Sequence, residues 1–224
     1  MIAAVRSRAV SLAVLLVASC ASHSTPRSAV GDYLTAEQQG RYADAHALLS
    51  STDRAARPLD AYVAEHVNAG PIWLAVAKRT QFTVGSLRQD GDSMFVSVKA
   101  RHPDPKVVEA AVPGIPVDVL STSPDPVARV TASVENTLEA SRFPTVEETL
   151  TFGAREEDGE WRVWLGLDRQ DQVIHLLAQA RAAVAKGDAE AARKAWTEAL
   201  DVEGDAAGVV ASLQEEAKKG LATP

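Results

Sequence analysis

The hydrophobic period of this chain changes twice, and those changes constrain its fold more than any other feature. Residues 28–69 carry apolar side chains at the spacing of amphipathic helices. Between residues 82 and 167 apolar and polar residues alternate in short runs, which is typical of strands that bury one face of an antiparallel sheet. After Asp168 the composition shifts to alanine, glutamate, glutamine, lysine and leucine, which favour helices. The expected fold class is therefore α+β, with N-terminal helices, an antiparallel sheet and then a C-terminal α-helical hairpin.

Three helices are expected before the sheet, each with one apolar stripe. Gly40 offers a C-terminal break after the first helix, because glycine readily adopts the left-handed conformation that ends helices. A turn is expected at residues 50–53, and Gly70-Pro71 closes the third helix. The stripes are Val30, Tyr33 and Leu34, then Tyr42, Ala45, Leu48 and Leu49, then Leu59, Tyr62 and Val63.

Two β-hairpins are expected, each with an Asp-Gly pair at its turn. Asp90-Gly91 and Asp158-Gly159 are both favoured two-residue hairpin turns. We expect the apolar residues on either side of these turns to share one buried face of the sheet. In the first hairpin they are Phe82, Val84, Met94, Val96, Val98 and Ala100, and in the second Leu150, Phe152, Ala154, Trp161, Val163, Leu165 and Leu167.

The segments outside the hairpins differ sharply in composition. Residues 102–126 contain six prolines, which predicts a long exposed insertion with one short strand at residues 116–120. A helix is expected after it, at residues 127–140. Near the C-terminus, helices are expected at 171–186 and 189–201, and a third could form at 205–219.

The N-terminal residues predict export from the cytoplasm. Arg6 and Arg8 precede an apolar run at residues 9–18, which is the layout of a secretory signal peptide. The run is about half of the ~20 residues that a helix needs to cross a bilayer. Val17-Ala18-Ser19-Cys20 then resembles the lipobox of bacterial lipoproteins, in which an aliphatic residue and two small ones precede a cysteine. Residues 1–19 are therefore interpreted as a signal peptide, and 20–27 as a lipidated tether.

The lipoprotein resemblance implies a lipid anchor and a place in the cell. A thiol readily takes a diacylglycerol as a thioether, so Cys20, the only cysteine, is the expected lipidation site and the protein's contact with the membrane. The competing interpretation is a plain secretory signal followed by a chance cysteine. The expected location is the cell envelope. In a host with two membranes, Ala21 after the cysteine favours the outer membrane with the protein facing the periplasm.

Two further resemblances divide the rest of the chain. Residues 28–168 resemble the nuclear-transport-factor-2-like fold, in which a curved sheet wraps a helix to form a cone. The resemblance rests on the helices before the hairpins and on the last strand, Asp158-Gly159-Glu160-Trp161-Arg162-Val163. Residues 169–224 resemble a tetratricopeptide repeat, with Gly187-Asp188 at the turn. The residues that fit the repeat's spacing are Leu176, Ala180, Ala183, Ala192, Trp196, Ala199 and Leu200.

The tetratricopeptide-like segment implies that its helices pack against another part of the chain or against another protein. A single repeat buries no continuous core, so these helices are expected to dock on the sheet domain or on a protein partner.

Composition and motifs exclude several function classes. The net charge of −7 opposes binding to nucleic acid. No phosphate loop, dinucleotide fingerprint or nucleophile elbow is present, so no cofactor and no catalytic set is assigned. The five histidines, His23, His46, His66, His102 and His175, show no metal-binding spacing, so no metal site is expected.

One acidic residue breaks the apolar pattern of the second hairpin. Glu148 falls in the register of Leu150 and Phe152, so it could point into the cone and line a pocket. The competing interpretation is a frayed strand end where its carboxylate reaches water. The sequence therefore predicts a non-enzymatic, lipid-anchored binding or scaffolding module. The alternative is a small-molecule-binding or isomerase-like enzyme that uses the cone interior, as ketosteroid isomerase does.

Overall fold

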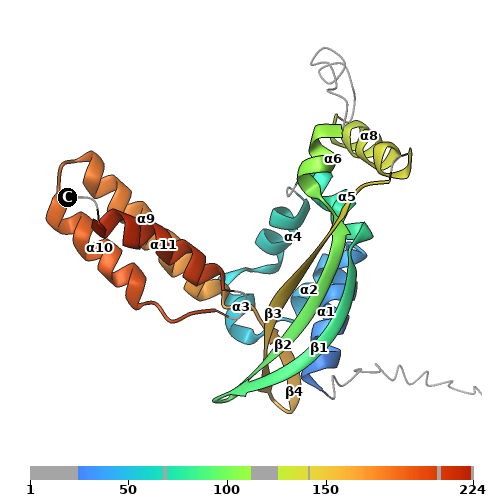
Figure 1. Cartoon of the computed structure of the whole chain (residues 1–224). Helices are drawn as coiled ribbons and strands as arrows, with labels where there is room; N and C mark the ends of the chain where they lie inside the picture. The colour runs from blue at the N-terminus through green and yellow to red at the C-terminus, as the bar shows by residue number, and fades with distance from the viewer. Residues whose placement is uncertain (1–24, 68–69, 112–125, 141, 206–207, 223–224) are drawn as a thin grey trace, which may run out of the picture.

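The computed structural model describes residues 25–67, 70–111, 126–140, 142–205 and 208–222. It is an α+β structure, as predicted: N-terminal helices, an antiparallel sheet and C-terminal helices follow one another along the chain (Figure 1). The predicted signal peptide and lipobox, with Cys20, lie outside the described residues. In the part of the chain that is described, no helix is both long and apolar enough to cross a membrane.

In the described part of the chain five helices precede the sheet, where the sequence predicted three. The first begins two residues before the predicted start of the domain, and Thr25 caps it by accepting a hydrogen bond from the Ser28 amide. The expected turn at 50–53 is instead the start of a short helix, because the Ser50 side chain caps it through the Asp53 amide. The helices are α1 Pro26–Gln38, α2 Tyr42–Ala47, α3 Ser51–Ala56, α4 Leu59–Val67 and α5 Pro71–Arg79.

The sheet is an antiparallel meander of four strands, in the order β1-β2-β3-β4. Both predicted hairpins form, and the β3–β4 turn is Asp158-Gly159 as predicted. The β1–β2 turn lies one residue later than predicted, at Gly91-Asp92, because Asp90 still pairs with Ser93 in the ladder. The strands are β1 Gln81–Asp90, β2 Ser93–Pro103, β3 Thr145–Glu157 and β4 Glu160–Trp164.

One face of the sheet packs on α1 and holds the main core. Val96 and Val98 of β2 and Val163 of β4 are fully buried there, as the alternation predicted. The ring of Tyr33 on α1 lies 6.2 Å from that of Phe152 on β3, centroid to centroid. Strands β2 and β3 stay in register through these residues, so the apolar pattern alone assigned their buried face.

A second, smaller core lies at one end of the sheet, where the described part of the proline-rich region packs on α5. Residues 105–111 form the helix α6 Pro105–Ala111 and Val108 is fully buried, so the prediction of an exposed insertion is wrong for this part. The expected strand at 116–120 lies outside the described residues. The helix predicted at 127–140 is confirmed as α8 Pro126–Ala140, which packs with α5 and α6. The members of this core are Ala75, Val76, Val108, Val134 and Leu138, with Ile72, Val130 and Phe143 against them.

Three C-terminal helices form a bundle of their own. They are α9 Leu167–Ala185, α10 Ala189–Asp201 and α11 Val209–Ala222, so the third helix that the sequence allowed does form. It packs on both others and closes the core that a lone hairpin would leave open. A Cβ on Gly220 would come within 2.3 Å of the Trp196 ring, so this glycine lets α11 approach α10 closely.

A buried carboxylate joins the bundle to the sheet domain. Asp53 on α3 accepts hydrogen bonds from the backbone amides of Leu165 and Leu167, each at 2.7 Å, and from the Ser50 hydroxyl at 2.8 Å. Leu165 and Leu167 lie where β4 ends and α9 begins, so one side chain fixes this corner of the chain. Beside it, Arg57 forms an ion pair with Asp171 of α9.

Candidate functional site

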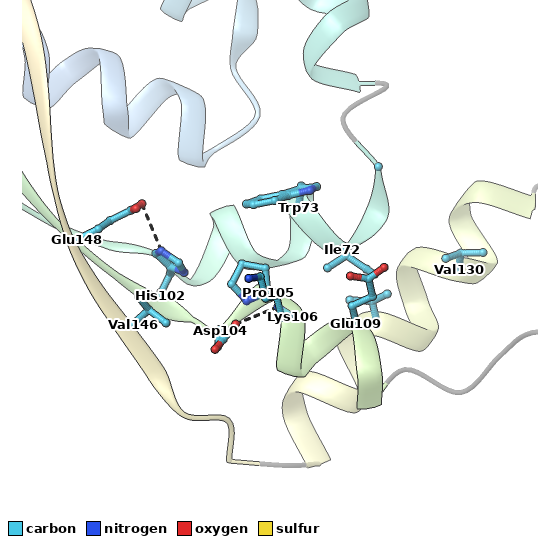
Figure 2. A pocket seen from close by; sticks show the side chains of 12 residues that line it. Ile72, Trp73, His102, Asp104, Pro105, Lys106, Glu109, Val130, Val146 and Glu148 are labelled. Atoms are coloured by element: carbon cyan, nitrogen blue, oxygen red, sulfur yellow. Dashed lines mark hydrogen bonds and ion pairs between the residues drawn. The ribbon is translucent and has the colours of Figure 1, made fainter. Parts of the chain in front are cut away.

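A cavity of about 770 Å³ lies where α5, α6 and α8 meet the ends of β2 and β3 (Figure 2). This volume is within the range of pockets that hold small-molecule ligands, about 300–1,000 Å³. Its lining comes from segments that are far apart in the sequence. The residues that line it are Gly70, Ile72, Trp73, His102, Asp104, Pro105, Lys106, Glu109, Val130, Val134, Val146 and Glu148.

The apolar part of the cavity is centred on helix α5. Pro71 stands at its first turn, where a missing amide proton costs nothing, and the next turns bury Ala75 and Val76. Trp73 lies on the opposite side of α5, and 60% of it is exposed. In Figure 2 its indole ring faces the cavity, between Glu148 on one side and Ile72 on the other. A large exposed aromatic ring beside a hollow is a common feature of ligand sites.

The predicted pocket residue, Glu148, does line this cavity. It pairs with Ala100 in the register of the buried face, two residues from Leu150. Strand β3 begins three residues earlier, at Thr145, so Glu148 is part of the ladder. Its side chain is nevertheless 50% exposed, so its carboxylate also reaches water.

His102 stands beside Glu148 and was not singled out by the sequence. Its Nε2 lies 3.3 Å from the Glu148 Oε1, and its side chain is only 11% exposed (Figure 2). Its Nδ1 lies 2.8 Å from the backbone oxygen of Pro103. A carbonyl oxygen only accepts hydrogen bonds, so Nδ1 carries a proton, and Nε2 is the nitrogen that faces the carboxylate.

Three more charged residues line the cavity at its α6 side. Asp104 caps α6, because its Oδ1 accepts a hydrogen bond from the backbone amide of Lys106 at 3.0 Å. Glu109 and Lys106 are exposed, and the structure gives neither side chain an ion pair among the described residues. With Glu148, the lining therefore holds three carboxylates and one lysine.

Trp73 also lines a second, smaller hollow of about 190 Å³ between α1, α4, α5 and β1. Beneath it lies a network of polar side chains. The Tyr33 and Tyr62 hydroxyls are 3.0 Å apart, and the Tyr62 hydroxyl donates to the Glu37 carboxylate. The other Glu37 oxygen lies 3.1 Å from Nε2 of His66.

The network holds its members in definite protonation states. Burial, together with the nearby Glu37 carboxylate, raises the pKa of Tyr33 well above its ordinary value. Burial and the neighbouring Tyr33 and Glu37 side chains raise the pKa of Tyr62 in the same way. Both phenols therefore stay protonated. Burial lowers the pKa of His66, but the hydrogen bonds to Glu37 and to the Tyr62 carbonyl outweigh it, so the pKa of His66 is raised overall.

The raised pKa of His66 predicts a pH-dependent stability. A histidine whose pKa is higher in the folded than in the unfolded protein stabilises the fold at acidic pH, and this contribution is lost as the pH rises through the folded pKa. We expect the wild-type free energy of unfolding, measured with urea, to be lower at pH 8.5 than at pH 5.5 by the contribution of His66. His66→Gln should reduce the drop between the two values, whereas the same substitution at the exposed His175 should leave it unchanged. If the free energy of unfolding fell equally between the two pH values in the wild type and in both variants, the raised pKa of His66 would be contradicted.

The four histidines that the structure describes do not gather into a metal site. Among the described residues, no group of three His, Cys, Asp or Glu side chains is placed to hold a metal ion. His46 instead contacts the Arg57 carbonyl, and His175 contacts Gln179. The remaining histidine, His23, lies outside the described residues, as does the predicted lipidation site Cys20.

The sequence identified one wall of the cavity and missed the others. Glu148 was found from strand register, which is a local property. Trp73 and Ile72 were missed because helix α5 was not expected. The signal for it was present: Pro71 is a good first helical residue, and Ile72, Leu74, Ala75 and Val76 follow it. His102 could be recognised only through its contact with Glu148 across two strands.

Comparison with known proteins gives no relative: no family model, no curated protein and no solved structure matches this chain. The resemblances to the nuclear-transport-factor-2-like fold and to the tetratricopeptide repeat stay predictions, as do the lipoprotein signal and the protein partner of the C-terminal helices. What the fold and the cavity define is a helix-and-sheet domain with a pocket at one end of the sheet, joined to a helical bundle.

Proposed function

We propose that this protein is a lipid-anchored, non-enzymatic binding module of the cell envelope, and that the cavity beside Trp73 is its binding site. The observation that carries the proposal is the cavity itself. It is large enough for a small organic molecule, and the apolar side chains of Ile72, Trp73, Val130 and Val134 are among its walls. Burying apolar surface of a ligand against such walls is favourable by about 25 cal/mol per Å².

The isomerase-like alternative has less support. A carboxylate that moves protons in such enzymes works in a dry pocket, where burial tunes it. The Glu148 carboxylate is instead half exposed and already faces His102. A protein that only binds its ligand needs no shielded base, so a binding function fits this geometry better.

An uncharged fluorescent probe tests the cavity directly. We expect N-phenyl-1-naphthylamine to bind the full-length Cys20→Ala chain, which has no acyl chains to compete for the probe, saturably and at one site. Val146→Trp should weaken this binding at least tenfold, because Val146 lines the cavity, is 37% exposed and leaves room for a ring to grow into the hollow.

A matched valine provides the control. Val209 on α11 is 39% exposed and lies in the helical bundle, away from the cavity, so Val209→Trp should leave the affinity unchanged. Absence of saturable binding, or an equal effect of the two substitutions, would overturn the proposed site.

A further inference from the structure

The charges around the cavity are unbalanced, and this bears on what the cavity binds. Asp104, Glu109 and Glu148 face it with carboxylates, and among the described residues of its lining Lys106 is the only lysine or arginine. Oδ1 of Asp104 is engaged in capping α6 and Oε1 of Glu148 faces His102, which leaves the Glu109 carboxylate and the second oxygen of Glu148 to meet a ligand. In Figure 2 these two lie on opposite sides of Trp73. An anionic ligand would meet repulsion here, whereas a cation would meet attraction.

The contact between His102 and Glu148 adds a more specific requirement. Nε2 of His102 lies 3.3 Å from the Glu148 Oε1, so this contact occupies one oxygen of the carboxylate and leaves the other, Oε2, for a ligand. The Glu148 side chain is 50% exposed, so a ligand can reach that oxygen. An N–H group on a cationic ligand would form a charge-assisted hydrogen bond to it, which a charged head without N–H groups cannot form.

The Trp73 ring points to the same ligand chemistry. The face of an indole ring attracts cations within about 6 Å of its centre, and it packs equally well on alkyl chains. Trp73 is exposed and lies on helix α5 beside the apolar wall formed with Ile72. A ligand with an apolar part and a cationic head can therefore use the wall, the ring and the carboxylate together.

We propose that the cavity binds an amphipathic primary ammonium ion, whose N–H groups contact Glu148 and whose apolar part packs on Trp73 and Ile72. This inference rests on the proposed function, since it names the ligand class of the same site. It adds a claim that an apolar cavity alone does not make: charge and donor groups decide which ligand is preferred.

Four probes that share one alkyl chain separate the effect of the charge from the effect of the N–H donor groups. They are octylammonium, octyltrimethylammonium, octan-1-ol and octanoate, titrated by calorimetry into the full-length Cys20→Ala chain below their micelle concentrations. Octylammonium is expected to bind at least tenfold more tightly than octanol and octanoate. It should also bind severalfold more tightly than octyltrimethylammonium, which has the charge but no N–H donor.

Removal of one charge tests the role of Glu148. Glu148→Gln keeps the shape of the side chain, so we expect octylammonium to bind about tenfold more weakly and octanol to bind as before. A structural defect would weaken both. Glu190→Gln is the control, because Glu190 is an exposed glutamate on α10, remote from the cavity, and should change neither affinity.

The outcomes distinguish the two proposals. If octanol or octanoate binds as tightly as octylammonium, or if the trimethylated probe does so, the ammonium ligand is wrong and the apolar binding site stands. If Glu148→Gln weakens octanol as much as octylammonium, the ammonium contact is equally wrong. If none of the probes binds, both the ligand class and the proposed function fail.

Discussion

Replacement of Cys20 by alanine is expected to release this protein from the membrane almost completely. Cys20 is the only cysteine of the chain, so no other thiol can carry the diacylglycerol. A single acyl chain binds a membrane only marginally and two or more anchor it stably, at about 0.8 kcal/mol per buried CH₂ group. Partition of the wild-type and Cys20→Ala proteins between detergent and aqueous phases, with labelling by palmitate, measures both the modification and its effect.

A substitution beside the cysteine separates lipidation from other effects. Ala21→Ser keeps the thiol and should leave the protein in the detergent phase with its palmitate label. The competing interpretation, a plain secretory signal, gives a different result: the wild-type protein would then be unlabelled and would enter the aqueous phase just as the Cys20→Ala protein does.

Replacement of Asp53 by alanine is expected to have the largest effect on stability, a loss of about 3 kcal/mol or more in the free energy of unfolding. The substitution removes the acceptor for the amides of Leu165 and Leu167 and for the Ser50 hydroxyl. Asp53 is fully buried, so the donors left behind lie in a region where water cannot readily replace the carboxylate. Urea denaturation followed by circular dichroism measures the loss.

An exposed aspartate gives the comparison for Asp53. Asp60 lies in the first turn of α4 at the surface, and Asp60→Ala should change the free energy of unfolding by less than about 0.5 kcal/mol. If Asp53→Ala cost no more than Asp60→Ala, the buried carboxylate would not be what fixes the corner between β4 and α9.

The strands and most of the helices could be predicted because their signals are local. Gly91 in the first hairpin and Asp158-Gly159 in the second adopt the positive φ that tight hairpin turns need, and alternation then assigns each strand residue to a face. The same holds for the long C-terminal helices, whose strong helix formers extend over several turns.

The short elements were missed for a different reason. Helices α3 and α6 have six and seven residues, too few to show a hydrophobic period. Prolines at 103 and 105 made the segment around α6 look like a loop, although Pro105 stands at the first position of that helix, where proline is well tolerated. These helices form because each has a cap and packs on a neighbour.

The sequence by itself determined the class of the fold, the faces of the sheet, the acidic residue in the register of the buried face, and the expected export and lipid signal. Only the tertiary structure brought Trp73, His102 and Glu148 to one cavity. These residues come from α5, β2 and β3, and their approach depends on how α5, α6 and α8 pack at the end of the sheet. Local preferences carry no information about that packing, because a cavity is the space left between elements that are distant in the chain.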